Sequence, residues 1–238
     1  RVLGRTLAGR RQMGPNDKVT ALRALRVPGL PRFRMADAAD ASAKDVYFIR
    51  HGEAAHNVAP RPWGEELVDA RLTAVGRQQA AGLVPQAACV TLDVVIVSPL
   101  VRAIETATIG LAAHLERGVP FVVEELCREQ LGPNLPDKRR PKHALAAAHP
   151  ALDFNAVPDG EDALFMTERE ELPLISTRAD AFLHWLHARP EQRIAVVTHS
   201  SFLAALLNAA LDSRAQPEVG EWFGNAEMRH VRLARLSH

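Results

Sequence analysis

Three short apolar runs in this chain lead into polar residues capable of chemistry, and they constrain the fold more strongly than any other feature. The first run, 46–49, is Val-Tyr-Phe-Ile and continues directly into Arg50, His51 and Gly52. Its length and its β-branched and aromatic residues predict a buried central strand of a parallel sheet. Open parallel sheets bind ligands at the carboxyl ends of their strands, so Arg50 and His51 are expected at a site.

An arginine beside a histidine at a strand end suggests the binding and transfer of a phosphoryl group. A guanidinium binds phosphate oxygens through its planar set of donors, and an imidazole can act as the nucleophile. Taken alone, the motif is explained equally well by a strand that ends in solvated polar residues, because short motifs produce false positives. The other two runs are needed to decide between these interpretations.

The second run, 92–97, leads into Ser98 and Pro99, where we expect a helix to begin. Serine is a good N-cap, and proline is favoured at the first helical position. Arg102 then falls in the first helical turn, and its side chain leans toward the same crevice as the first motif. Helix N-termini also favour anions. The alternative for Arg102 is a surface ion pair with Glu105.

The third run, 194–198, ends in Thr198 and is followed by His199. With all three runs in view, the sequence resembles the histidine phosphatase superfamily, also called the phosphoglycerate mutase-like family. The shared motifs are Arg-His-Gly, Ser-Pro-Leu-x-Arg-x-x-x-Thr and a late Thr-His. The resemblance extends from about Lys44 to the C-terminus. Among the branches, the chain most resembles the plant and fungal phosphoglycerate mutase-like proteins, through 125–129 and 223–227.

The resemblance implies a fold and a reaction centre. The fold is an α/β three-layer α/β/α sandwich with a mostly parallel central sheet. His51 is then the nucleophile that forms a phosphohistidine. Arg50, Arg102 and His199 stabilise the charge on the phosphoryl oxygens, which is the main catalytic task in phosphoryl transfer.

The resemblance also implies an acidic proton donor after the strand expected at 119–123. In the family this acid commonly lies shortly before a glycine. Glu129, three residues before Gly132, fits best, and Glu125 is the reserve candidate. A solvated run of acids is the alternative for both.

Two further residues are expected to contact phosphate. The family residue that matches Asn57 lies near the bound phosphate. Ser200 stands where the family usually has a glycine, and its hydroxyl can contact phosphate or narrow the pocket. His56 stands where true mutases usually have a tryptophan, and this departure favours a phosphatase over a mutase.

Three more elements are expected around these motifs. Thr73 is a suitable N-cap for a helix over 74–81. A second helix, over 176–189, has apolar residues at helical spacing, which predicts a stripe that faces the core. A strand over 227–236 is expected to complete the domain.

The sequence therefore predicts a metal-independent phosphomonoester hydrolase of the histidine acid phosphatase type. It would act on a small phosphorylated substrate through a phosphohistidine and without a cofactor. No His-Glu-x-x-His or comparable metal-binding spacing is present. The alternatives are a phosphoglycerate or sugar-phosphate mutase, and a non-catalytic structural or phospho-ligand-binding subunit that keeps the fold. No motif indicates the substrate or the oligomeric state.

The distribution of charge divides the chain into two parts. Residues 1–34 hold nine of the 29 Lys and Arg residues but one of the 28 acids, so the remainder has seven more acids than bases. Basic, acid-poor segments are typical of targeting peptides and of arms that bind anionic partners. We expect 1–43 to be an extension and linker, serving as a tail, a targeting segment or an arm for a protein partner. We expect 44–238 to be the phosphatase domain, with an insertion at about 133–170 that caps the site.

Cysteine use and hydropathy indicate the environment. Cys89 and Cys127 form no CxxC pair, so neither a disulfide framework nor a zinc site is indicated. We therefore expect a reducing compartment, either the cytoplasm or an organellar matrix or stroma. No apolar run approaches the roughly 20 residues that span a bilayer, so no transmembrane segment is expected. We expect no direct role with nucleic acid.

Overall fold

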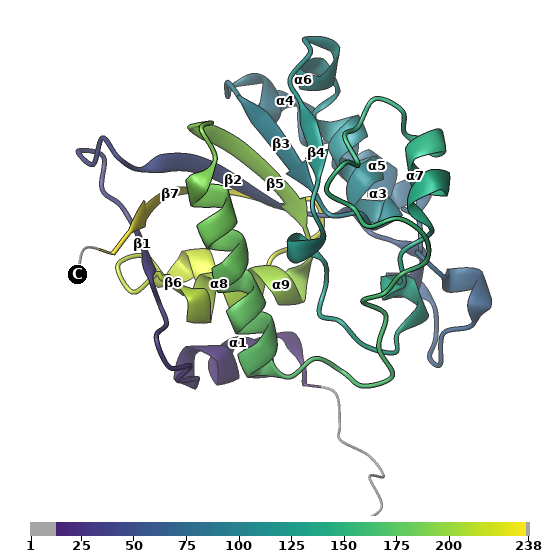
Figure 1. The fold of residues 1–238 in the computed structure, drawn as a ribbon, viewed down its shortest axis with the longest axis horizontal. Coiled ribbons are helices and arrows are strands. Elements are labelled where there is room, and N and C mark those ends of the chain that lie inside the picture. Colours follow the sequence, from purple (N-terminus) through teal and green to yellow (C-terminus); the bar gives the residue numbers. More distant parts are fainter. Residues whose placement is uncertain (1–12, 237–238) are drawn as a thin grey trace, which may run out of the picture.

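The computed structural model describes residues 13–236, which form a seven-stranded sheet between two layers of helices (Figure 1). The strands are β1 (Phe33–Met35), β2 (Lys44–Arg50), β3 (Val94–Val97), β4 (Phe121–Val123), β5 (Arg193–Thr198), β6 (Leu211–Asp212) and β7 (Met228–Arg235). Their order is β4-β3-β5-β2-β7-β1-β6. Only β7 is antiparallel to its neighbours among these strands. The expected three-layer sandwich with a mostly parallel sheet is confirmed.

Nine α-helices within residues 13–236 surround the sheet. They are α1 (Pro15–Ala24), α2 (Ala55–Val58), α3 (Ala74–Ala81), α4 (Val84–Ala88), α5 (Val101–Gly110), α6 (Ala112–Glu116), α7 (Lys142–Ala148), α8 (Leu172–Ala188) and α9 (Ser200–Ala205). Shorter helical turns are η1 (Glu65–Leu67), η2 (Glu125–Cys127), η3 (Leu135–Asp137), the π-helical η4 (Leu206–Ala210) and η5 (Pro217–Gly220).

Alternation along the central strands divides the core into two halves. Val46 and Phe48 of β2 point to one face of the sheet, where α1, α8 and α9 pack. Ile49 points to the other face, where α4, α5 and α7 contribute side chains. Successive strand residues point to opposite faces, and both faces of this sheet are covered. This explains why the central strands are almost continuously apolar.

Helix α3 is capped by the residue that the sequence predicts, whereas helix α5 is not. Thr73 caps α3 as predicted, because its Oγ1 accepts the backbone N–H of Gly76 at 3.0 Å. The prediction that Ser98 caps α5 is wrong. The first helical residue is Val101, and its N–H donates to Oδ1 of Asp69 at 2.8 Å. A carboxylate from a distant loop thus takes the capping role, which leaves the Ser98 hydroxyl available elsewhere.

The helix expected over 176–189 starts earlier, at Leu172, with a proline in its first turn. Its predicted apolar stripe is buried. The final strand was expected over 227–236 and is observed as β7, within one residue at each end. These differences are small because the apolar spacing that defines each element lies inside it.

The structure differs from the expected domain boundary at Lys44. Leu22 of α1 and Phe33 of β1 are fully buried. β1 is a member of the sheet, between β7 and β6, and α1 lies beside α9 (Figure 1). Apolar side chains among the many basic ones therefore attach residues 13–43 to the domain. Residues 1–12 lie outside the described residues, and a tail, targeting or partner role for that segment stays a prediction.

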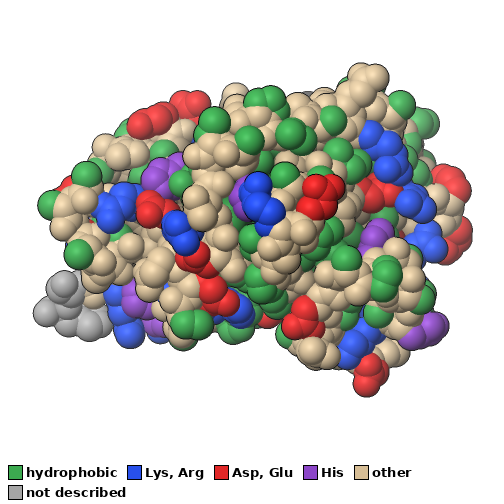
Figure 2. Space-filling view, turned by 90° about the horizontal axis from the view of Figure 1, so that it is seen from above, with side chains coloured by type: hydrophobic (Ala, Val, Ile, Leu, Met, Phe, Trp, Pro, Cys, Tyr) green, Lys and Arg blue, Asp and Glu red, His purple; other side chains and the backbone are tan. Residues whose placement is uncertain are grey.

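The surface and helices add two general observations. The face shown in Figure 2 carries both acidic and basic side chains. Within residues 13–236, no helix has the length and apolar character needed to cross a membrane.

Replacing Phe33 with alanine should test whether this N-terminal segment belongs to the folded unit. Loss of a fully buried aromatic ring should lower the free energy of unfolding by about 3–4 kcal/mol. Urea unfolding measures the change. Leu174→Ala is the control, because Leu174 is 56% exposed and its loss should change stability by less than about 0.5 kcal/mol. Equal stability of the two variants would contradict the assignment.

Candidate active site

Two histidines meet at the carboxyl ends of neighbouring parallel strands. Arg50 of β2 is paired in register with Thr198 of β5, and the N–H of His51 donates to the carbonyl of Thr198 at 3.0 Å. This register places His51 beside His199, with their ring centroids 5.1 Å apart. The strand-end motifs that are far apart in sequence thus lie at one edge of the sheet.

The hydrogen bonds of His51 define which of its nitrogens can react. Nδ1 lies 2.6 Å from the carbonyl oxygen of Gly52, and a carbonyl can only accept, so Nδ1 carries the proton. Nε2 is then unprotonated, and it accepts a hydrogen bond from Nε of Arg102 at 3.3 Å. Burial, together with the charges of Arg102 and Arg50, holds the pKa of His51 well below its ordinary value. The ring is therefore neutral and presents a lone pair on Nε2.

Gly52 allows the strand end to lie close against the helices. A Cβ at this position would be 2.5 Å from the carbonyl oxygen of Gly76 in α3, which is too close for any side chain. The Gly52 N–H donates to Oγ1 of Thr106 in α5 at 3.0 Å. The last threonine of the second motif therefore fixes the backbone next to His51.

Arg102 is held by the insertion rather than by its own helix. Its NH1 donates to the carbonyl of Pro136 at 2.6 Å, and its NH2 pairs with Oδ1 of Asp137 at 2.8 Å. The side chain is fully buried. The alternative of a surface ion pair with Glu105 is contradicted, because Glu105 instead pairs with arginines 71 and 77. Burial in this bonded position aims the Arg102 guanidinium at His51.

Four buried nitrogens at the site lack a partner among residues 13–236. They are Nδ1 of His199, Nε of Arg50, Nδ1 of His56 and Nε1 of Trp63. Nε2 of His199 lies 2.7 Å from the hydroxyl of Ser98, the residue wrongly predicted to cap α5. Burial is the main cause that lowers the pKa of His199, followed by the charge of Arg102. Buried donors without partners are costly, so this arrangement is suited to an anion that accepts hydrogen bonds from them.

The structure separates the two candidate proton donors. Glu129 lines a cavity of about 340 Å³ at the site and accepts the N–H of Ser201 at 3.1 Å. Glu125 instead forms ion pairs with Arg128 at 3.0 Å and Arg139 at 2.6 Å, and it does not line the cavity. Glu125 is therefore tied into a buried ion-pair cluster, whereas Glu129 faces the space where a substrate would lie.

The two expected phosphate contacts also line this cavity. Asn57 accepts the N–H of Ala54 through Oδ1 at 2.9 Å, and its Nδ2 lies 3.1 Å from Nε2 of His56. Ser200 lies near the proton-donor candidate, with its hydroxyl 3.4 Å from Oε2 of Glu129. Both side chains therefore have hydrogen-bonding atoms at the cavity.

His56 fills the space between the nucleophile candidate and a tryptophan. Its ring centroid lies 6.0 Å from that of His51 and 5.4 Å from that of Trp63. Burial and the charge of Arg102 lower the pKa of His56 to about 2. A neutral imidazole thus forms part of the pocket wall beside Trp63.

Sequence reasoning missed three residues of the site. Asp137, which holds Arg102, and Arg169, which lines the cavity, both lie in the insertion, where no pattern distinguishes them from solvated loop charges. Lys18 reaches the cavity from α1, a segment expected to lie outside the domain. No signal within the sequence could have placed these residues, because each depends on a contact between distant segments.

Within the described residues, no group of three or more His, Cys, Asp or Glu side chains is arranged to hold a metal ion. The positive charge of the site comes from arginines and a lysine. Two histidines and two arginines gather at the carboxyl ends of neighbouring strands in an α/β fold. This arrangement defines a class of proteins that have an anion pocket at the strand ends. A family model described as the histidine phosphatase superfamily, branch 1, matches residues 46–235, and the chain belongs to this family.

Individual relatives agree with this family. Phosphoglycerate mutase-like protein 1 of Arabidopsis thaliana is 31% identical over 227 residues, which cover 79% of this chain and 80% of that protein. A probable phosphatase of Schizosaccharomyces pombe is 28% identical over 169 residues, covering 66% of this chain and 74% of that protein. The resemblance to plant and fungal phosphoglycerate mutase-like proteins is therefore confirmed.

A solved structure shares the fold. The alpha-ribazole phosphatase from Shigella flexneri superposes with a TM-score of 0.55 at 23% sequence identity. The match covers 81% of this chain and 95% of that chain.

The buried neutral histidines should make the protein less stable in acid. His51, His56 and His199 have lowered pKa values in the folded state, so the unfolded chain binds more protons once the pH falls below about 6.5. Below that pH, each of these histidines lowers the free energy of unfolding by about 1.4 kcal/mol for every further pH unit. Asp69 acts in the opposite direction, because burial raises its pKa to about 6. Urea unfolding at pH 7.5 and pH 5.5 should differ by about 3 kcal/mol.

Single variants identify the source of this pH dependence. His56→Asn should remove about 1 kcal/mol of the difference between the two pH values, because one lowered pKa is lost. His143→Gln, at an exposed residue of α7, is the control variant and should leave the difference unchanged. A folded protein equally stable at both pH values would contradict the neutral state of these rings.

Proposed function

We propose that the protein is a metal-independent phosphomonoester hydrolase that works through a phosphohistidine on Nε2 of His51. One observation carries the proposal. Nε2 is unprotonated and buried, and it lies 3.3 Å from a guanidinium that is itself fixed by two further partners. A neutral imidazole beside an anchored cation is suited to attack on a phosphorus atom whose oxygens the cation binds.

In the first step, Nε2 of His51 attacks the phosphorus in line and the bond to the leaving oxygen breaks. The Nδ1–H bond to the Gly52 carbonyl supports this step, because it stabilises positive charge as the imidazole forms the N–P bond. The ring does not need to lose a proton before it attacks, since its lowered pKa keeps it neutral at physiological pH.

The charge on the phosphoryl oxygens would be stabilised by Arg50, Arg102 and His199. Nε of Arg50 and Nδ1 of His199 are buried without partners among residues 13–236, so each can donate to a phosphoryl oxygen. In this proposal the hydroxyl of Ser98, 2.7 Å from Nε2 of His199, donates to that nitrogen and so leaves the proton on Nδ1. A phosphate dianion would also favour protonation of His199 by opposing the lowering of its pKa.

Glu129 would donate a proton to the leaving oxygen in the first step. It would then take a proton from the water that attacks the phosphohistidine, and inorganic phosphate would leave. The position of Glu129 at the cavity supports this role, as does its contact with the Ser201 N–H, which holds the carboxyl in place. Asn57 and Ser200 would add hydrogen bonds to the phosphoryl group.

Two alternatives differ from this proposal in what happens to the phosphohistidine. A phosphoglycerate or sugar-phosphate mutase would keep it and return the phosphoryl group to a second hydroxyl. A structural or ligand-binding subunit would not form it. The names of the plant relatives suggest the first alternative, and the name of the fission yeast relative suggests a phosphatase. The imidazole of His56 in place of a tryptophan favours the phosphatase.

The thiols support a reducing compartment as part of the proposal. Cys89 and Cys127 are both free, and Cys127 is fully buried, with its pKa raised by desolvation. A buried neutral thiol is an ordinary apolar core residue. A cytoplasmic or organellar location is consistent with two unpaired cysteines.

The principal test is hydrolysis of a generic aryl phosphate with a chelator present. Wild type should turn over, and His51→Ala should lose at least about 10³-fold in kcat/KM, because the nucleophile is gone. Acid-labile, base-stable phosphorylation after rapid mixing should occur in wild type and not in His51→Ala. His230→Ala, an exposed histidine, is the matched control and should match wild type.

The outcomes distinguish the alternatives. Activity that is lost on chelation and restored by added metal would overturn metal independence. A stable phosphohistidine that is released to a hydroxyl acceptor and not to water would favour a mutase. Absence of both turnover and phosphorylation in wild type would favour the non-catalytic subunit.

A pair of Glu→Gln variants should separate chemistry from stability. Glu129→Gln should lower kcat by about 10²–10⁴-fold, because it removes the proton donor, and should leave the fold intact. Glu125→Gln should instead lower the free energy of unfolding by about 2 kcal/mol, because two buried arginines lose an ionic partner. Steady-state kinetics and urea unfolding of both variants check the pattern, and the reverse pattern would assign the donor to Glu125.

A further inference from the structure

Lys18 brings the N-terminal helix into the pocket. It is 6% exposed, and it lines the same cavity as Glu129 and Ser200. Its Nζ donates to Oε1 of Gln130 at 2.9 Å and to the hydroxyl of Ser201 at 3.0 Å. These are two of the three hydrogen bonds that an ammonium group can donate.

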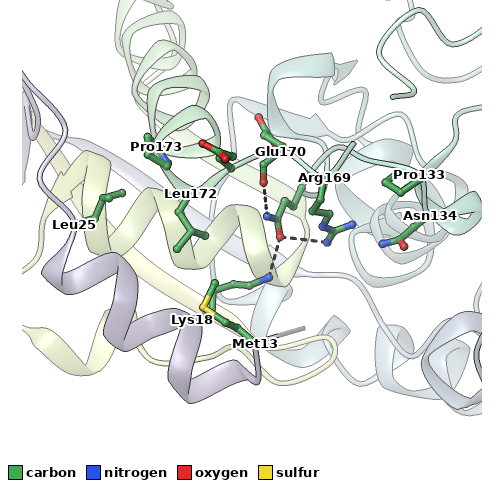
Figure 3. Close-up of a pocket in the computed structure, with 11 residues that line it drawn as sticks. Met13, Lys18, Leu25, Pro133, Asn134, Arg169, Glu170, Leu172 and Pro173 are labelled. Atoms are coloured by element: carbon green, nitrogen blue, oxygen red, sulfur yellow. Dashed lines mark hydrogen bonds between the residues drawn. The ribbon is translucent and has the colours of Figure 1, made fainter. Parts of the chain in front are cut away.

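A second cation approaches the same oxygen from the insertion. NH2 of Arg169 donates to Oε1 of Gln130 at 3.2 Å, so the dashed lines from Lys18 and Arg169 meet at one amide oxygen (Figure 3). NH1 of Arg169 contacts Oδ2 of Asp137 at 3.4 Å. Two like charges are thus held side by side by a neutral acceptor. Burial lowers the pKa of Lys18, Glu129 opposes this, and the charge of Arg169 lowers the pKa further.

The balance of charge around the pocket favours more than one anionic group. The charged side chains at it are the cations Lys18, Arg50, Arg61, Arg102 and Arg169 and the acids Glu129 and Asp137. The proposed role of Glu129 requires its protonated form when substrate binds, which leaves one carboxylate against five cations. A phosphate dianion offsets two of the four positive charges that remain, so two are still unbalanced. Arg61 lies over the ring of Trp63, whereas Lys18 and Arg169 share one amide oxygen as their acceptor.

The position of the pair relates it to the leaving group. Lys18 donates to the hydroxyl of Ser201, and the N–H of the same residue donates to Glu129, the proposed proton donor to the leaving oxygen. An adjoining cavity of about 590 Å³ is bordered by Lys18 and Arg169 as well, together with Leu172 (Figure 3). There is therefore room beyond the proton donor for the body of a substrate.

We propose that Lys18 and Arg169 form a second anion-binding subsite, which selects phosphomonoesters whose leaving group carries an acidic group of its own. This inference rests on the proposed hydrolysis at His51. The acidic group is a carboxylate or a second phosphate, which share the ability to accept from an ammonium and a guanidinium together. The N-terminal helix α1 then determines substrate choice, and it does so through one buried side chain.

The test compares two substrates that differ in one charge. These are 3-carboxyphenyl phosphate and 3-carbamoylphenyl phosphate, which share a ring and a phosphate. Wild type should favour the carboxylate about tenfold in kcat/KM, mainly through KM, because a charge-assisted contact is worth about one factor of ten in affinity. Lys18→Met and Arg169→Gln should each reduce this preference, the ratio of the two kcat/KM values, to less than about twofold.

Controls make the result specific. Arg23→Gln removes a charge from the exposed side of the same helix and should keep the tenfold preference. Thermal unfolding checks that each variant folds, and Arg169→Gln provides an independent answer if Lys18→Met does not. A further probe is 3-(phosphonomethyl)phenyl phosphate. Comparing its kcat/KM with that of 3-carboxyphenyl phosphate shows whether the subsite prefers a phosphate-like group or a carboxylate.

Calorimetric binding of the matching non-hydrolysable phosphonates separates this inference from the proposed function. A charge preference in binding that depends on Lys18 and Arg169 supports the subsite even if wild type does not turn over. Turnover of both substrates with no preference, or a preference that survives in both variants, overturns the subsite and leaves the hydrolysis at His51 standing.

Discussion

The hydrogen bond from Nε of Arg102 to Nε2 of His51 is the contact on which the rest of the site depends. It can form only while Nε2 lacks a proton, and the carbonyl of Gly52 ensures this by binding the proton on Nδ1. Arg102 is in turn held by Pro136 and Asp137, so a guanidinium can be fully buried. A strand end, a helix and a loop of the insertion must all be in place for one contact.

This arrangement is electrostatically demanding without a bound anion. Cations and neutral histidines are buried together, and three of their nitrogens lack partners among residues 13–236, namely Nε of Arg50 and Nδ1 of His56 and of His199. The same burial that lowers the pKa of His51 and His199 makes a phosphate dianion the natural counterion. The fold thus holds the anion-binding groups in place before an anion binds. Burying these groups costs free energy of folding, which the two apolar cores on either side of the sheet offset.

Membership of the histidine phosphatase superfamily fits this picture, and a segment that precedes the matched residues 46–235 also contributes to the site. The family match begins at residue 46, yet the N-terminal helix supplies Lys18 to the pocket. Leu22 and Phe33 fix this segment by apolar burial. A segment that a charge count marks as separate is therefore joined to the domain by its few buried residues.

The sequence by itself determined the central strands, the capped helix α3 and the group of residues that meets at one edge of the sheet. These features follow from local patterns: apolar runs make buried strands, and parallel strands bring Arg50, His51 and His199 to the same end. Tertiary structure decided the rest. It placed Glu129, and not Glu125, at the cavity and brought the hydroxyl of Ser98 to His199. It also paired Arg102 with Asp137 and placed Lys18 in the pocket. Each of these is a contact between polar side chains of distant segments, and such contacts leave no periodic pattern in the chain because only the packed fold sets which charges meet.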